Sequence, residues 1–153
     1  LKHSKLFTIM YEFLLNTHNL TRWILLPLMV VVIVLGIAGM TGSRKYTKAD
    51  KALGGAMLGL AHLQLLLGLI LFFISPQVQA ALQDMGAAMK DSVLRKMVVE
   101  HPLIGIIAVV LIQLGRSFSK KALADQRKHK LVVIYSGIAL VLILSRIPNW
   151  NFF

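Results

Sequence analysis

Four separate stretches of this 153-residue chain are apolar enough and long enough to cross a lipid bilayer. A helix needs about 20 apolar residues to span the hydrocarbon core. The sequence predicts such spans over residues 20–40, 53–74, 95–115 and 130–147. The composition agrees, because 57% of the residues are hydrophobic, whereas soluble domains have roughly 45–50%. We therefore expect an all-α fold, a single integral membrane domain built as an up-and-down four-helix bundle.

The charge distribution orients this bundle. In an up-and-down arrangement, the connections after the first and third spans lie on one side of the membrane. They carry ten of the seventeen Lys and Arg residues, so the positive-inside rule makes this side cytoplasmic and places both termini outside. The formal net charge is +11. In loops between spans this charge suits anionic lipid headgroups, and no nucleic-acid partner is expected.

The two ends of the chain are expected to contact the membrane interface. Residues 6–15 are expected to form an amphipathic lead-in, which either lies at the interface or extends the first helix. Thr17 or Asn19 is expected to cap the helix of the first span. After the fourth span, the sequence predicts an aromatic anchor at Trp150, Phe152 and Phe153.

The longest connection, residues 75–94, alternates small and polar residues and is expected to form a short surface helix on the outer side. The second span is expected to stop before Pro76, since the residue preceding a proline disfavours the helical conformation. Asp91 or Ser92 is expected to start the third long helix, ahead of the membrane edge.

Several kinds of chemistry are excluded by what the sequence lacks. Cysteine is absent, which excludes disulfides, thiolate metal sites, iron–sulfur ligation and covalent c-type haem attachment. No nucleophile–base–acid grouping, glycine-rich phosphate loop or nucleotide fingerprint occurs. Catalysis by side chains is therefore not expected, and the chain is at most an electron-transfer component.

Each predicted span carries one histidine within it or at its edge: His18, His62, His101 and His129. Ionisable side chains inside a bilayer are costly unless they face the bundle interior, a cavity or a ligand. Neutral imidazole is a good ligand for haem iron, and two imidazoles from facing helices hold a b-type haem without a covalent link. The four histidines are therefore candidate ligands of haem iron.

Short connections make sequential helices antiparallel neighbours, so the first and third spans lie diagonally, as do the second and fourth. His18 and His101 would then form a pair near the outer side, and His62 and His129 a second pair toward the cytoplasmic side. One or two b haems are expected. The outer pair is the more plausible, because His62 lies roughly 18 Å below the outer end of its helix and His129 about 27 Å below its own.

Other polar and small residues accompany the histidines. Arg22, one turn after His18, and Lys96 are expected near haem propionates on the outer side. Small residues on the histidine stripes leave room either for a porphyrin edge or for close helix packing. Gln64 and Gln113, inside spans, are candidates for hydrogen bonds to a quinone carbonyl or to a neighbouring helix.

Four segments together resemble a known family: His18-Asn-Leu-Thr-Arg-Trp23, His62-Leu-Gln-Leu-Leu-Leu-Gly68, Glu100-His-Pro102 and Arg127-Lys-His-Lys130. They are similar to small bacterial four-helix membrane proteins often labelled cytochrome b, and more distantly to cytochrome b561-type bundles. The resemblance covers nearly the whole chain from about Met10. The chain departs from the b561 pattern in having one histidine per span.

The resemblance implies b-haem binding and transmembrane electron transfer in the bacterial inner membrane. In that membrane, the orientation from the positive-inside rule makes both termini periplasmic. It implies quinol, a periplasmic donor or a larger respiratory complex as partner. The residues themselves leave two alternatives open. One is a cofactor-free structural subunit that packs against other membrane subunits or a second copy, its histidines being hydrogen-bonded packing residues or lipid contacts. The other is a quinone-binding accessory protein without haem.

Overall fold

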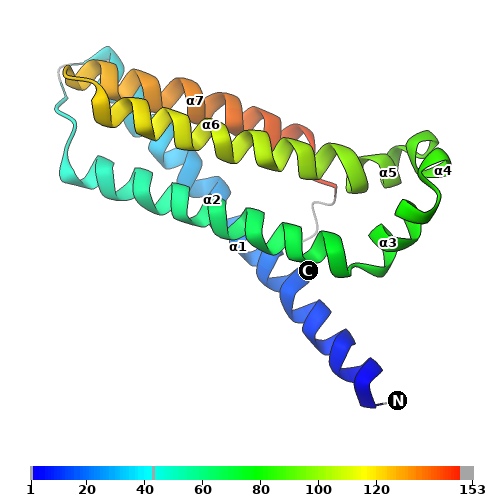
Figure 1. The fold of residues 1–153 in the computed structure, drawn as a ribbon. Helices are drawn as coiled ribbons and strands as arrows, with labels where there is room; N and C mark the ends of the chain where they lie inside the picture. The colour runs from blue at the N-terminus through cyan, green and yellow to red at the C-terminus, as the bar shows by residue number, and fades with distance from the viewer. Residues whose placement is uncertain (1, 43, 149–153) are drawn as a thin grey trace.

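The structure, a computed structural model, describes residues 2–42 and 44–148, with the side chains of Lys5 and the residues after it in these ranges. All regular secondary structure in these ranges is helical (Figure 1). The helices are α1 (Lys2–Thr41), α2 (Lys48–Ile74), α3 (Pro76–Gln83), α4 (Met85–Lys90), α5 (Ser92–Arg95), the π-helical turn η1 (Lys96–Glu100), α6 (His101–Lys121) and α7 (Asp125–Ser145). The aromatic anchor expected at residues 150–153 lies outside the described residues.

The four long helices α1, α2, α6 and α7 run alternately up and down (Figure 1). Helix α1 packs against α2 and α7, while α6 packs extensively against α7 and more sparsely against α2. Helices α1 and α6 are therefore diagonal partners, as are α2 and α7. The structure confirms the expected all-α, up-and-down architecture.

Four continuous helical stretches are long and apolar enough to cross a membrane: Lys5–Thr41, Lys48–Ile74, Ser92–Lys121 and Asp125–Ser145. Large apolar side chains on their outward faces are exposed, among them Val34 and Val141. Such faces suit a lipid environment, because each helix satisfies its backbone hydrogen bonds internally. The helices indicate a multi-pass membrane protein.

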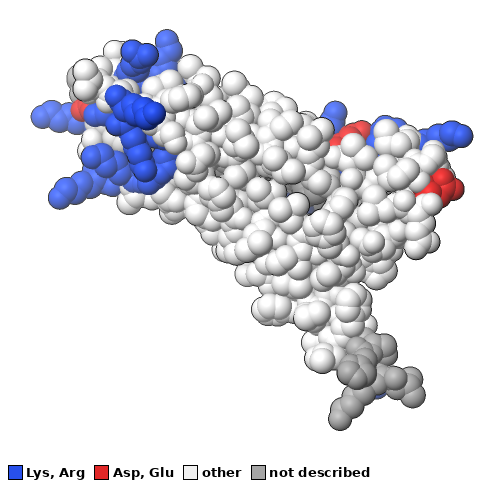
Figure 2. Space-filling view, in the orientation of Figure 1, with Lys and Arg blue, Asp and Glu red and all other residues white. Residues whose placement is uncertain are grey.

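The two ends of the bundle differ in charge. The connections between α1 and α2 and between α6 and α7 meet at one end, where Lys and Arg side chains gather (Figure 2). We call this the basic end. The short helices α3, α4 and α5 cover the other end, which we call the distal end (Figure 1).

Helix α1 is a single helix of 40 residues, so the expected cap at Thr17 or Asn19 is wrong. The Thr17 hydroxyl instead donates to the carbonyl of Phe13, 2.7 Å away in the preceding turn. Because no cap interrupts the backbone, residues 6–15 extend the first helix, which was one of the two expected arrangements. The N-terminal part of α1 diverges from the other helices and projects away from the side of the bundle near its distal end (Figure 1).

The boundaries of α2 follow from local capping. Thr47 and Asp50 form a capping box: the Asp50 carboxylate accepts from the Thr47 N–H at 2.8 Å, and the Thr47 hydroxyl oxygen accepts from the Asp50 N–H at 3.4 Å. The helix ends at Ile74, before Ser75 and Pro76. This confirms the expected stop.

The distal connection contains two short helices, α3 and α4, rather than the one expected, because Ser75 and Asp84 each cap a new helix. Asp91 caps α5, which continues through η1 into α6. The Asp91 carboxylate accepts from the N–H groups of Val93 and Leu94 at 2.8 and 2.9 Å. The third long helical stretch therefore starts directly after Asp91, as predicted.

The interior contains two apolar clusters. The central cluster draws on all four long helices: Leu25, Met29, Val32, Met57, Ala61, Ala108, Ile112, Val132 and Ala139. The distal cluster packs under α3 and α4: Val78, Ala81, Ala88 and Val98. Along each helix, His18, Gln64 and His101 come between the residues of the central cluster and the distal end. A polar layer therefore separates the two clusters.

Candidate functional site

His18 of α1 and His101 of α6 face each other across the diagonal of the bundle. Their ring centroids are 6.3 Å apart, and the ring planes are 81° from parallel. Both side chains are half-buried, and both lie in the distal half of the bundle. The structure thus brings together the first of the two pairs that the topology predicted.

His101 is held by a backbone carbonyl. Its Nδ1 lies 3.1 Å from the carbonyl oxygen of Arg146, which follows α7. Because a carbonyl only accepts, the proton of the neutral ring is on Nδ1, and Nε2 keeps its lone pair. A partner of this kind is what orients a metal-binding imidazole in proteins.

The backbone before His101 is irregular. The π-helical turn η1 ends at Glu100, and the N–H of His101 donates to the carbonyl of Lys96, five residues earlier. Single π turns inside α-helices are rare and are frequent at functional sites. The sequence contains no signal from which this turn could have been predicted.

His18 is oriented by Gln64 of α2, whose side-chain nitrogen lies 3.1 Å from Nε2 of His18. Since the amide nitrogen donates, Nε2 accepts, and the proton of the neutral ring is on Nδ1. Within the described part of the chain, neither this buried Nδ1 nor the buried Oε1 of Gln64 has a hydrogen-bond partner. An unsatisfied donor and an unsatisfied acceptor in one polar layer leave hydrogen-bonding capacity for a bound molecule.

Two glycines determine the space around the pair. A Cβ atom on Gly68 would lie 3.1 Å from Cε1 of His18, so the absence of a side chain lets this ring approach α2. A Cβ atom on Gly105 would meet nothing within 4 Å. Gly105 is one turn beyond His101 on the same face of α6, so there is open space beside this histidine.

Charged groups lie on both sides of the polar layer, Arg22 toward the central cluster and Glu100 with its partners toward the distal end. Arg22, one turn after His18, is only 8% exposed and lies 5.4 Å from the centre of the Trp23 ring. Glu100 forms ion pairs with Arg95 at 2.9 Å and with Arg146 at 3.0 Å.

Lys96 is half-buried in the turn η1. Arg22 and Lys96 therefore both lie in the distal half, where the sequence places them. Their roles toward propionates stay predictions.

The structure does not bring His62 and His129 together. Ala61, beside His62, is buried in the central cluster, and one residue along a helix rotates the side chain by about 100°. His62 is therefore on the exposed face of α2, where its Nδ1 lies 3.0 Å from the carbonyl oxygen of Leu58 in the same helix.

His129 belongs to a second polar cluster at the basic end. It is 1% exposed, and its ring centre lies 4.9 Å from that of Tyr46. Gly39 of α1 faces it so closely that an added Cβ would lie 2.2 Å from Cδ2 of the imidazole. The imidazole is therefore fully enclosed, although its neighbours in the sequence, Arg127, Lys128 and Lys130, are basic.

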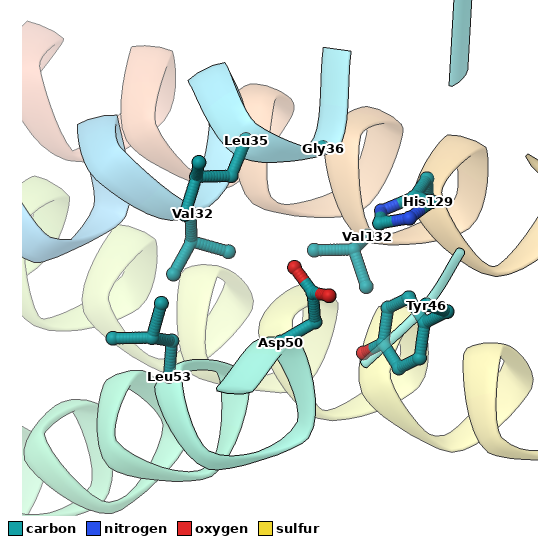
Figure 3. Close-up of a pocket in the computed structure, with 8 residues that line it drawn as sticks. All are labelled: Val32, Leu35, Gly36, Tyr46, Asp50, Leu53, His129 and Val132. Carbon is teal, nitrogen blue, oxygen red and sulfur yellow. The ribbon is translucent and has the colours of Figure 1, made fainter. Parts of the chain in front are cut away.

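Arg44 joins three helices in this cluster. Its Nη2 donates to the Asp50 carboxylate at 2.7 Å, and its Nη1 lies 3.4 Å from both the carbonyl oxygen of Leu35 and Nε2 of His129. A cavity of ≈ 10 Å³ adjoins the cluster (Figure 3). Its lining residues are Val32, Leu35, Gly36, Tyr46, Asp50, Leu53, His129 and Val132.

Arg44, Tyr46 and Asp50 were not among the predicted site residues. The only local signal for them is the Thr47–Asp50 capping spacing, which indicates a helix start and not a contact with α7.

No family model matches this chain, and no curated protein or solved structure matches it.

Proposed function

We propose that this protein is a membrane-bound b-type cytochrome that holds one haem between His18 and His101 and transfers electrons through it. The observation that carries the proposal is the 6.3 Å separation of the two ring centroids on diagonal helices. A metal–imidazole bond is about 2 Å long, so two imidazoles on opposite sides of one metal ion have centres roughly 6 Å apart. The separation in the structure supports a bis-histidine arrangement.

The residues around the pair fit a haem. His101 has its Nδ1 bonded to the Arg146 carbonyl and its Nε2 available as a ligand. The buried Nδ1 of His18 has no partner among the described residues. It would bind iron with the ring proton moved to Nε2, where the flipped Gln64 amide would accept this N–H through Oε1. Arg22 and Lys96 would supply positive charge for the propionates. When bound, haem iron supplies one-electron oxidation and reduction, and the surrounding apolar helices keep water away from it.

One haem is proposed rather than two. The imidazole of His129 is enclosed by Arg44, Tyr46 and Gly39, and a second bis-histidine site would need it to face His62. His62 is on the opposite, exposed side of α2. His129 is therefore proposed as a packing residue of the basic end.

The proposal places the haem in the distal half of the membrane. With the basic end cytoplasmic, as the positive-inside rule indicates, the haem is near the periplasmic side of a bacterial inner membrane. Electron partners on that side are a quinol within the bilayer, a periplasmic donor, or another subunit of a respiratory complex.

The test is an absorption spectrum of the protein purified in detergent from membranes supplied with haem, first oxidised and then reduced. We expect a Soret band that shifts on reduction. His18→Ala and His101→Ala are each expected to lose it, whereas the matched control His62→Ala keeps it. Adding free imidazole to His101→Ala is expected to restore part of the band, which separates ligand loss from misfolding.

A colourless wild-type protein after haem supply would contradict the proposal and favour a cofactor-free subunit or a quinone-binding accessory protein. A Soret band that persists in both His18→Ala and His101→Ala would contradict the ligand assignment.

A further inference from the structure

We propose that an anionic phospholipid binds at the basic end, in the seam between α2 and α6. This end carries ten Lys and Arg residues and only two carboxylates, Asp50 and Asp125 (Figure 2). Arg44 binds the first at 2.7 Å, and Lys128 binds the second at 2.7 Å. Among the described residues, the other eight basic residues form no ion pair with these two carboxylates, so the end as a whole attracts anions.

Arg116 of α6 lies in the seam. Its Nη1 donates to the carbonyl of Lys51 at 3.0 Å. Its guanidinium lies against α2, because Cβ atoms on Gly54 and Gly55 would be 3.4 and 3.1 Å from its nitrogens. A guanidinium has five N–H donors in a planar fork that matches phosphate oxygens. One contact with a carbonyl leaves the other donors available.

Two lysines flank this guanidinium. Lys51 at the start of α2 and Lys120 at the end of α6 are both exposed. Lys51 is three residues from the end of its helix and Arg116 five, so both are within about 8 Å of the helix ends. This is the depth at which lipid phosphates meet a membrane-spanning bundle.

Polar side chains continue one turn deeper on the same face of α6. The Gln113 amide donates to the Ser117 hydroxyl at 3.3 Å, and Gln113 is exposed. A primary amide toward hydrocarbon is costly unless its groups are hydrogen-bonded. The ester carbonyls of a phospholipid are deeper than its phosphate, and they are acceptors for the second N–H of this amide.

The α2 side of the seam lacks side chains at two positions. Gly55 and Gly59 lie one turn apart on one face, and a Cβ atom on Gly59 would meet nothing within 4 Å. Helices α2 and α6 also pack against each other more sparsely than the other neighbouring pairs. The part of the seam below the basic residues is therefore apolar and loosely packed, which suits an acyl chain. Neither a nucleic acid nor an acidic peptide carries an acyl chain that would cover this apolar part of the seam.

The test compares lipid binding by two triple variants that lose the same charge at the same end. Lys51→Gln/Arg116→Gln/Lys120→Gln removes the seam residues, and Lys45→Gln/Arg127→Gln/Lys130→Gln removes three basic residues elsewhere. Full-length protein in a neutral detergent is titrated with phosphatidylglycerol or with phosphatidylcholine of the same chains, and bound lipid is counted by native mass spectrometry. We expect phosphatidylglycerol binding to weaken at least about tenfold in the seam variant and by much less in the control.

Gln113→Leu keeps every charge and is expected to weaken binding about threefold, because one hydrogen bond to the lipid is lost. It keeps the proposal testable if the seam variant fails to fold. If the two triple variants lost phosphatidylglycerol affinity equally, the lipid would be attracted by the overall positive charge of this end, and the proposed site would be overturned. Equal binding of the two lipids by the wild type would overturn it as well. An unchanged affinity in Gln113→Leu would overturn the ester contact.

Discussion

The side-chain amide of Gln64 on α2 lies 3.1 Å from Nε2 of His18 on α1, although the two residues are 46 positions apart. The amide donates, so the proton of the imidazole is on the other nitrogen, Nδ1. Gln64 therefore determines both the tautomer of His18 and the position of its ring opposite His101. The contact also ties α1 to α2 in the polar layer.

Removing this amide is expected to destabilise the bundle. In Gln64→Leu, Nε2 of His18 is left without its donor in a half-buried layer, and an unsatisfied group of this kind costs about 1–3 kcal/mol. The measurement is the free energy of unfolding in a neutral detergent free of anionic lipid, followed by tryptophan fluorescence.

Gln113→Leu is the matched control, since Gln113 is exposed and, within the described residues, its side chain bonds to Ser117 of its own helix and to no other helix. Its effect is expected to be within about 0.5 kcal/mol. If the two substitutions had equal effects, the Gln64–His18 hydrogen bond would contribute nothing to stability.

Gly39 is expected to be intolerant of any side chain. In Gly39→Ala the new methyl group would lie 2.2 Å from the His129 ring, and overpacking of this kind costs about 1–3 kcal/mol. Gly137→Ala is the control, because nothing lies within 4 Å of its Cβ position. Replacing this helical glycine is expected to raise the free energy of unfolding by about 0.5–1 kcal/mol.

A double variant tests whether the His129 ring is the cause of this destabilisation. In a protein that already carries His129→Ala, the ring is gone, and Gly39→Ala is expected to add almost no further cost. The two effects would then be strongly non-additive, as contacting residues are. Simple additivity would show that Gly39 is constrained by something other than the imidazole.

The topology of the outer histidine pair could be predicted, and the surroundings of the other two histidines could not. Four apolar runs with short connections determine which helices are diagonal, and this places His18 opposite His101. The rotation of each helix about its own axis is not determined in the same way. Helix α2 is apolar all round, so its pattern does not show that Ala61 faces the core and His62 faces outward.

Long-range polar contacts also could not be predicted from local sequence patterns. The guanidinium of Arg44 reaches Nε2 of His129, 85 residues later, and no spacing rule links a loop arginine to a histidine of the last helix. The expected cap at Thr17 was wrong for a related reason. Threonine has two local options, to cap a helix or to donate to the preceding turn, and the apolar residues before it allow the helix to continue.

Asp50 is expected to be the most sensitive polar residue of the basic end. Its carboxylate accepts from Arg44, from the Thr47 N–H and from the Thr47 hydroxyl, at 2.7 to 2.8 Å. Asp50→Asn removes the charge and one acceptor oxygen and leaves Arg44 without its counter-ion. We expect a loss of about 1–3 kcal/mol in the free energy of unfolding.

Thr47→Ala is the comparison for this prediction. It removes the hydroxyl of the capping box but leaves the ion pair in place, and loss of such a cap costs about 1 kcal/mol. Asp50→Asn is therefore expected to be the more damaging of the two. The reverse order would mean that the capping interaction, and not the link to Arg44, is the main contribution of this aspartate.

The orientation in the membrane can be tested by labelling introduced cysteines. The chain contains no cysteine of its own that would also be labelled. Lys45→Cys places a thiol at the basic end, and Lys90→Cys places one on α4 at the distal end, with the same loss of charge. A membrane-impermeant maleimide is expected to label position 90 in intact spheroplasts and position 45 only in inverted vesicles, since the more basic side faces the cytoplasm. The opposite pattern would put the His18–His101 pair near the cytoplasmic surface, and electron partners would then have to be sought on that side.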